Sequence, residues 1–178
     1  MAGPRLQSLA IAEPGVLKLG ADRQLVVQPR LLAEVQKGVE DRLGPKASEY
    51  LYTAGQTWAA GELQRLCGLA ASDDADALAR LFCQHATALG WGDWRIEALQ
   101  PDELGVLIQV TRSPFAEAYG QSDLPVCHLI AGAVAALAES LFRVTAACDE
   151  LHCLAQGAAG CQFAATGSDP AEGESWSW

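Results

Sequence analysis

Three cysteines and one glutamate toward the C-terminal end of the chain have the types and spacing of metal ligands. They are Cys127, Glu150, Cys153 and Cys161. Thiolate sulfurs are soft ligands that favour zinc or iron, and four protein ligands that complete the coordination shell favour a structural zinc ion. The spacing therefore predicts a closed metal centre. The competing interpretation is that these cysteines are small buried apolar residues, because free cysteine often has that role.

The sequence around these residues predicts how they would converge. Cys127 is expected in the first turn of an apolar helix over residues 125–143, where the positive end of the helix dipole favours a thiolate. Glu150 and Cys153 are three positions apart and would point to opposite faces of a regular strand. We therefore expect residues 151–153 to leave the strand as a turn or bulge, and Gly157 and Gly160 to let the chain fold back so that Cys161 faces Cys153.

Two histidines flank the predicted ligands. A divalent ion held by three thiolates and one carboxylate has a net charge of about −2, which calls for N–H donors nearby. His128 and His152 are the candidates for these supporting contacts, and either is an alternative to Glu150 as the fourth ligand. The other three cysteines, Cys67, Cys83 and Cys148, lie in helical or strand patterns and are expected to be packing residues.

Composition excludes several classes of protein. The 178 residues have a formal net charge of −10 and no cluster of lysine and arginine, which argues against binding to nucleic acid or to an anionic membrane surface. The apolar runs are shorter than the roughly 18–20 residues of a membrane span, and the N-terminus is a poor signal peptide. We expect a cytoplasmic protein, where clustered cysteines indicate metal more readily than disulfides.

Hydrophobic periodicity predicts the elements that position these residues. Apolar residues recur at helical spacing over 32–43, and they alternate with polar residues over 94–98. In the second helix the expected buried stripe is Ala47, Leu51, Ala54, Trp58 and Gly61, which would let another element approach closely. The expected elements are a hairpin at 16–19 and 25–27, helices at 29–43 and 47–66, a helix capped by Ser72 and stopped by Gly90, strands at 94–98 and 104–110, a polar connection at 111–124, a helix at 125–143, and strands at 144–151 and 161–166.

Strands and helices are segregated along the chain rather than strictly alternating. This order predicts an α+β fold in which an antiparallel sheet packs against a helical layer. We expect a flexible N-terminal arm at residues 1–15, one domain at 16–166, and an acidic flexible tail at 167–178.

The chain resembles the 4-vinyl reductase domain family over residues 31–166. The densest matches are GWGDW at 90–94, PVCHLIAG at 125–132 and CLAQGAAGCQF at 153–163. The family pattern of zinc ligands, a Cys on the helix and then Glu, Cys and Cys, has the spacing of the four residues named above. The segment LYTAGQTWAAGELQRL also resembles the helix that precedes this domain in phenol- and xylene-responsive regulators.

The resemblance implies the fold of vesicle-tethering (TRAPP Bet3-like) subunits and a pocket for a hydrophobic or aromatic small molecule. The implied pocket residues are Phe82, His85, Trp94, Leu104, Val106 and Ala131. The resemblance implies a pocket rich in aromatic residues, as in the phenol sensors, whereas the comparable strand and helix positions here are Leu104, Val106 and Ala131, which are smaller. This difference favours a larger apolar ligand or a pocket filled by Trp94, Phe82 and other side chains. His85 lies at the edge of an apolar helical stripe, a position that is more often occupied by a core histidine than by a ligand contact.

These expectations lead to one preferred function and two alternatives. The preferred function is a zinc-stabilised, non-catalytic sensor or carrier of a hydrophobic small molecule, which the resemblance implies is a homodimer. The first alternative is an accessory protein or reductase acting on a vinyl tetrapyrrole in bacteriochlorophyll synthesis. The chain has no GxGxxG fingerprint for the nucleotide that a reductase needs. The second alternative is a homodimeric interaction module without a ligand.

Overall fold

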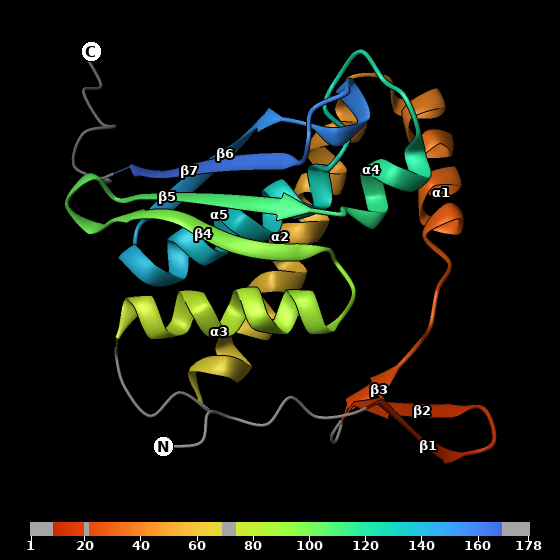
Figure 1. Cartoon of the computed structure of the whole chain (residues 1–178), viewed down its shortest axis with the longest axis horizontal. Coiled ribbons are helices and arrows are strands. Elements are labelled where there is room, and N and C mark those ends of the chain that lie inside the picture. The colour runs from red at the N-terminus through yellow and green to blue at the C-terminus, as the bar shows by residue number, and fades with distance from the viewer. Residues whose placement is uncertain (1–8, 20–21, 69–73, 169–178) are drawn as a thin grey trace, which may run out of the picture.

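A four-stranded antiparallel sheet forms the C-terminal part of the molecule, with strand order β4-β5-β7-β6 (Figure 1). The computed structural model describes residues 9–19, 22–68 and 74–168. The strands are β4 (Asp93–Gln100), β5 (Gly105–Thr111), β6 (Thr145–His152) and β7 (Cys161–Ser168). Ile108 and Phe163 pair across β5 and β7 and are fully buried, whereas the next pair, Gln109 and Gln162, is partly exposed. One face of the sheet therefore carries the core, which confirms the predicted antiparallel α+β class.

Helix α5 (His128–Phe142) covers the buried face of this sheet, α2 (Lys46–Cys67) packs against α5, and α3 (Ala75–Ala88) packs against β4 (Figure 1). Residues 130–138 of α5 are all buried. A helix that is apolar on every side has to be enclosed on every side, and α5 lies between the strands and α2. The position of α5 places its N-terminal end beside the ends of β6 and β7, where the predicted metal ligands lie.

Two glycines let α2 and α5 touch through their backbones. A Cβ atom on Gly132 of α5 would lie 1.9 Å from the carbonyl oxygen of Tyr52, and one on Gly55 of α2 would lie 2.0 Å from the carbonyl oxygen of Leu129. The buried residues of α2 are Ala47, Gly55, Ala59, Leu63 and Leu66. The predicted stripe was wrong at Ala54 and Gly61, which are exposed, whereas Trp58 is partly buried and packs against the core. The close approach between the helices occurs at Gly55.

The N-terminal segment forms its own small sheet, set apart from the larger one (Figure 1). Strands β1 (Leu9–Glu13), β2 (Val16–Leu19) and β3 (Asp22–Gln24) pair in sequence order, and α1 (Pro29–Leu43) follows. The expected arm at 1–15 thus contains a strand, and residues 1–8 lie outside the described residues. The strand predicted at 25–27 lies at Asp22–Gln24 instead. At the other end, β7 extends through Gly167 and Ser168, which were predicted to begin the tail.

The connection predicted at 111–124 contains a short helix, α4 (Pro114–Tyr119). The Ser113 side chain accepts a hydrogen bond from the Ala116 backbone N–H at 3.4 Å, and Pro114 occupies the first helical position. Serine before proline is a start signal for a helix. At the start of α3 the capping residue is Asp74, whose carboxylate accepts from the Asp76 N–H at 3.0 Å. The predicted cap, Ser72, lies outside the described residues.

Candidate metal centre

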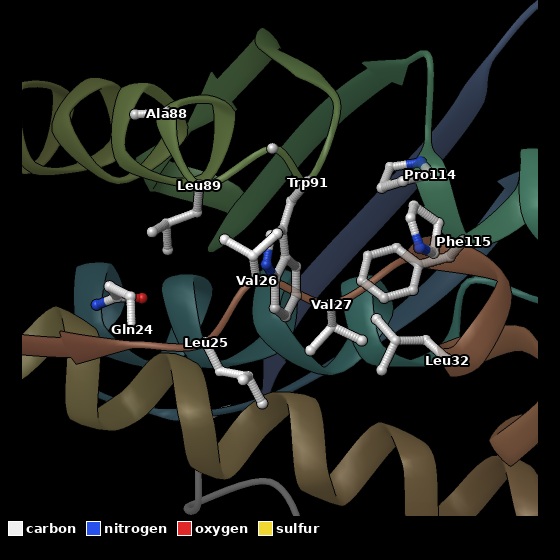
Figure 2. A pocket seen from close by; sticks show the side chains of 12 residues that line it. Gln24, Leu25, Val26, Val27, Leu32, Ala88, Leu89, Trp91, Pro114 and Phe115 are labelled. Atoms are coloured by element: carbon white, nitrogen blue, oxygen red, sulfur yellow. The ribbon is translucent and has the colours of Figure 1, made fainter. Parts of the chain in front are cut away.

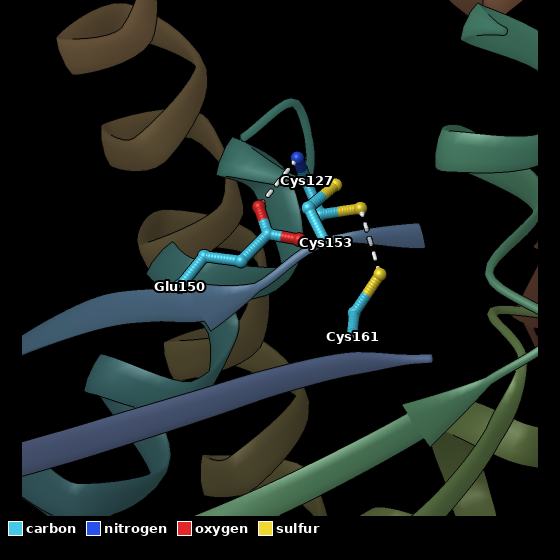
Figure 3. A group of neighbouring side chains, drawn as sticks. All are labelled: Cys127, Glu150, Cys153 and Cys161. Carbon is cyan, nitrogen blue, oxygen red and sulfur yellow. Dashed lines mark hydrogen bonds between the residues drawn. The ribbon is translucent and has the colours of Figure 1, made fainter. Parts of the chain in front are cut away.

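The structure brings Cys127, Glu150, Cys153 and Cys161 together, with one ligand atom from each lying within 4.8 Å of the others (Figure 3). The Sγ atoms of Cys127 and Cys161 are 3.6 Å apart. Sulfurs bound to one tetrahedral zinc ion at about 2.3 Å lie about 3.8 Å from each other. A disulfide would require about 2.05 Å. The separation of the two thiols therefore fits a shared metal ion, and it agrees with the spacing prediction.

Each candidate ligand occupies the end of an element. Cys127 is the N-cap residue of α5, one position before the first turn in which it was predicted. Glu150 lies near the end of β6, Cys153 follows that strand, and Cys161 is the first residue of β7. Because α5 and the β6–β7 hairpin supply different ligands, an ion at this point would join the helix layer to the sheet.

The strand leaves its regular register where the sequence requires it to do so. Pairing of β6 with β7 shifts between Glu150 and His152, and a 3₁₀ turn at Leu154–Gln156 follows. Gly157 has φ +90°, a conformation that side-chain-bearing residues rarely adopt. This irregular path turns Cys153 toward Glu150 and returns the chain to Cys161, as predicted.

Backbone N–H groups support the cluster. Glu150 Oε2 accepts from the Cys127 N–H at 2.9 Å, and Cys161 Sγ accepts from the Leu154 N–H at 3.3 Å. Neither histidine belongs to the group of four. His152 is exposed, whereas His128 is partly buried, and burial lowers its pKa. The N–H donors to the cluster are therefore main-chain groups at the start of α5 and at the 3₁₀ turn, and not the histidine side chains that were predicted.

The cluster has a charge imbalance that a cation would correct. Burial, followed by the neighbouring Cys153 thiol, raises the pKa of Glu150 to about 8. Hydrogen bonds from Cys127 and Cys161 lower the pKa of Cys153. The pKa of Cys127 is instead raised, by its hydrogen bonds with Cys153 and Cys161 and then by burial. Glu150 Oε1 is buried and has no hydrogen-bond partner. An unpaired buried carboxylate oxygen beside three thiols fits a divalent metal ion.

The raised pKa of Glu150 predicts a pH dependence with a definite sign. Between pH 4.5 and about 8 the metal-free folded protein retains a proton on Glu150 that the unfolded chain releases. The stabilisation from this group is complete below about pH 4.5 and is lost as the pH rises through 8. We therefore expect the Tm of metal-free protein, measured by differential scanning fluorimetry, to fall between pH 5 and pH 8.5.

The Tm of the metal-loaded protein should not fall over this pH range, because the metal ion takes the place of the proton on Glu150 and binds more tightly as the pH rises. Metal-free Glu150→Gln protein should have a flatter profile than metal-free wild type. Superimposable profiles for these two metal-free proteins would contradict the assignment to Glu150.

Most of the predicted pocket residues lie in a packed aromatic core. Phe82 and Trp94 are buried with ring centroids 5.9 Å apart, and Val106 is buried on the same side of the sheet. His85 is buried, with its Nε2 atom 2.7 Å from Glu62 Oε2, as expected of a core histidine. Leu104 lies in the β4–β5 turn with φ +50°. Ala131 lines a groove that Glu150 also lines.

An apolar cavity of about 380 Å³ adjoins this aromatic core. Figure 2 shows Trp91, Val27, Phe115 and Leu32 around it. Sequence reasoning missed this cavity because the segment after β3, the end of α3 and the start of α4 form it jointly, and they are distant in sequence. The rings of Trp58 and Trp91 stack at 4.1 Å, and Phe115 meets Trp91 edge-on at 5.1 Å, so the cavity has an aromatic wall.

Together, the fold and the cluster define an α+β domain in which three buried cysteines and a partly buried glutamate lie close enough to hold a metal ion. Residues 106–166, which contain all four cluster residues, match the family model of the 4-vinyl reductase domain. This match confirms the predicted resemblance to that family. A search of curated proteins finds no match.

Solved structures share the fold at low sequence identity. The phenol-responsive sensory domain of the transcription activator PoxR, determined with phenol, is 16% identical with a TM-score of 0.78, over 89% of this chain and 84% of that one. A vinyl-4-reductase family protein from Methanocaldococcus jannaschii is 19% identical with a TM-score of 0.54, over 82% and 84%.

Trafficking protein particle complex subunit 3 from Naegleria fowleri, covalently bound to palmitic acid, is 12% identical with a TM-score of 0.59, over 79% of this chain and 95% of that one. This likeness confirms the predicted vesicle-tethering type of fold. None of the helices in the described part of the chain has the length and hydropathy that crossing a membrane requires.

Proposed function

We propose that this chain is a zinc-stabilised, non-catalytic domain that binds an apolar small molecule, as a sensor or a carrier. The observation that carries the metal assignment is the convergence of three thiols and a partly unpaired carboxylate on one point. Zinc is the preferred ion because four closed ligands of this type are typical of structural zinc sites. Native mass spectrometry of protein purified without added metal tests this assignment and separates zinc from iron by mass.

The proposed ligand site is the apolar cavity beside Trp91 and Phe115. Its volume of about 380 Å³ lies within the range of small-molecule pockets. Phe82 and Trp94 fill the interior of the domain beyond this cavity. Their packing supports the expectation that, in this chain, these two side chains fill the space that corresponds to the pocket of the phenol sensors. The structural likeness to a phenol-binding sensory domain supports an aromatic or compact apolar ligand here.

Tryptophan fluorescence tests this site directly, because Trp91 lines the cavity. Titration with a one- or two-ring aromatic compound, such as phenol or naphthalene, should change the emission. The variant Leu32→Trp should fill the cavity and weaken binding at least tenfold, whereas Leu32→Ala, which enlarges the cavity, should still bind. Equal binding by both variants would place the ligand elsewhere.

We also propose that the chain forms a homodimer through the segment that joins β3 to α1, together with the first part of α1. Leu25 (82%) and Val26 (67%) are exposed on the joining segment, and Leu31 (58%) and Val35 (54%) are exposed on α1. Apolar side chains grouped in this way commonly mark an interface. We also propose a cytoplasmic location, because cysteines clustered as metal ligands are typical of a reducing compartment.

The double variant Leu31→Asp/Val35→Asp should convert the dimer to a monomer in size-exclusion chromatography with light scattering, because a charge on each position has to be desolvated at the interface. Leu43→Asp, an exposed position at the far end of the same helix, is the matched control and should remain dimeric. A wild-type protein that is monomeric at micromolar concentration would contradict the proposal.

A further inference from the structure

A second concave surface, distinct from the apolar cavity, lies between α1, α2, the loop before α5 and β6. This groove has a volume of about 1070 Å³. Its apolar lining includes Ala47, Val126 and Ala131, all buried, and Leu124, which is 72% exposed. The groove is thus large enough in volume for a chain of several carbons, and Leu124 offers it an exposed apolar side chain.

The charges around the groove all have one sign. Its lining contains the carboxylates of Glu40 from α1, Glu49 from α2, and Asp149 and Glu150 from β6, and it contains no lysine or arginine. Within residues 9–19, 22–68 and 74–168, none of these four carboxylates forms an ion pair with a lysine or arginine. With zinc bound, Glu150 and the three thiolates together would leave a net charge of about −2 at this wall, and Glu40, Glu49 and Asp149 supply the other negative charges.

The nearby lysines are not among the residues that line the groove. Lys37 Nζ donates to the carbonyl oxygen of Tyr119 at 2.9 Å and lies 4.6 Å from the centre of the Tyr119 ring. Lys46 lines an adjoining depression, which shares Glu49 and Thr53 with the groove. Like charges gathered around a concave apolar surface repel one another, and a cation between them removes that repulsion. The ring of Tyr52, which also lines the groove, adds an aromatic surface of the kind that attracts cations.

We propose that this groove binds an amphiphilic cation, a molecule with an amine or quaternary ammonium head and an apolar body of roughly eight carbons. Charge complementarity favours this class over a fatty acid or a neutral lipid. The proposal does not depend on the apolar cavity beside Trp91, because the two sites share no lining residue.

Isothermal titration of the metal-loaded protein with three eight-carbon probes tests the class of ligand. Octylammonium should bind at least tenfold more tightly than octanol, and octanoate should not bind measurably. Ethylammonium, which has the charge without the body, should bind at least tenfold more weakly than octylammonium. Equal affinity for octylammonium and octanol, or for octylammonium and ethylammonium, would overturn the proposal, as would no binding of octylammonium.

Substitution of carboxylates that are not metal ligands locates the site. Glu49→Gln/Asp149→Asn should weaken octylammonium binding by about 25-fold, since removing a charge about 5 Å from an ammonium in a wet groove costs roughly fivefold. Octanol binding, zinc content and Tm should not change. Glu103→Gln, an exposed carboxylate in the β4–β5 turn, is the matched control. Octylammonium binding that survives the double substitution would overturn the proposal.

Octylammonium titrated into Leu32→Trp protein separates this proposal from that for the apolar cavity. Binding in the groove should be unchanged there, even if the aromatic ligand is lost. Loss of octylammonium binding in Leu32→Trp would show that the probe enters the cavity instead.

Discussion

Cys161→Ser protein should be purified without its zinc and should unfold about 10–20 °C below the wild type. Serine keeps its hydroxyl proton at neutral pH and is a poor ligand for zinc, so the centre loses one of its three thiolates. The remaining ligands would then leave a buried carboxylate and two buried thiols without a cation. On the order of 5 kcal/mol of stability is at stake, given the large values measured for structural zinc and for broken buried networks. In a domain of this size, each kcal/mol corresponds to about 2–4 °C in Tm.

Two cysteines outside the cluster provide matched controls. Cys67 is exposed at the end of α2, and Cys83 is buried in α3. Cys67→Ser should retain both zinc and Tm, whereas Cys83→Ser should lower the Tm through packing and still retain zinc. A strong chelator should lower the Tm of wild type and leave Cys161→Ser unchanged. Full zinc occupancy in Cys161→Ser would contradict the assignment of the ligands.

The ligand cluster could be predicted from the sequence because its geometry is encoded locally. Glu150 and Cys153 can converge only if the strand is interrupted between them, and the register shift before His152 provides that interruption. Gly157, at φ +90°, lets the chain return to Cys161. The supporting donors could not be predicted, because they are main-chain N–H groups of Cys127 and Leu154, and every non-proline residue carries such a group.

The ligand-binding surfaces were harder to predict, because they depend on how distant segments pack. Periodicity identified Phe82 and Trp94 as inward-facing residues, but it could not show that their rings fill the interior. The cavity beside Trp91 requires the segment after β3, which carries no periodic signal, to lie against the end of α3. Helix α4 was missed for a different reason: its Ser113-Pro114 start signal was present, but six residues are too few for a helical period to be recognised.

The second large effect concerns the glycine contact between α2 and α5. Gly132→Ala should lower the free energy of unfolding by about 3 kcal/mol or more, which corresponds to roughly 6–12 °C in Tm. The added Cβ would lie 1.9 Å from the Tyr52 carbonyl oxygen and 2.8 Å from the Gln56 backbone nitrogen. Both atoms belong to the backbone of a helix, so no side chain can rotate away and the two helices must separate. Gly55→Ala should have a comparable effect, because its Cβ would meet the Leu129 carbonyl oxygen at 2.0 Å.

Gly61→Ala, on the same helix as Gly55, is the matched control. A Cβ at Gly61 meets nothing within 4 Å, so this substitution should raise stability by about 0.5–1 kcal/mol through the better helix propensity of alanine. Because Cys127 is the N-cap residue of α5, separating α2 from α5 should also displace the first metal ligand. We therefore expect Gly132→Ala to lose zinc to a chelator faster than Gly61→Ala. A Gly132→Ala protein with wild-type Tm and wild-type zinc release would show that the two helices do not meet at this glycine.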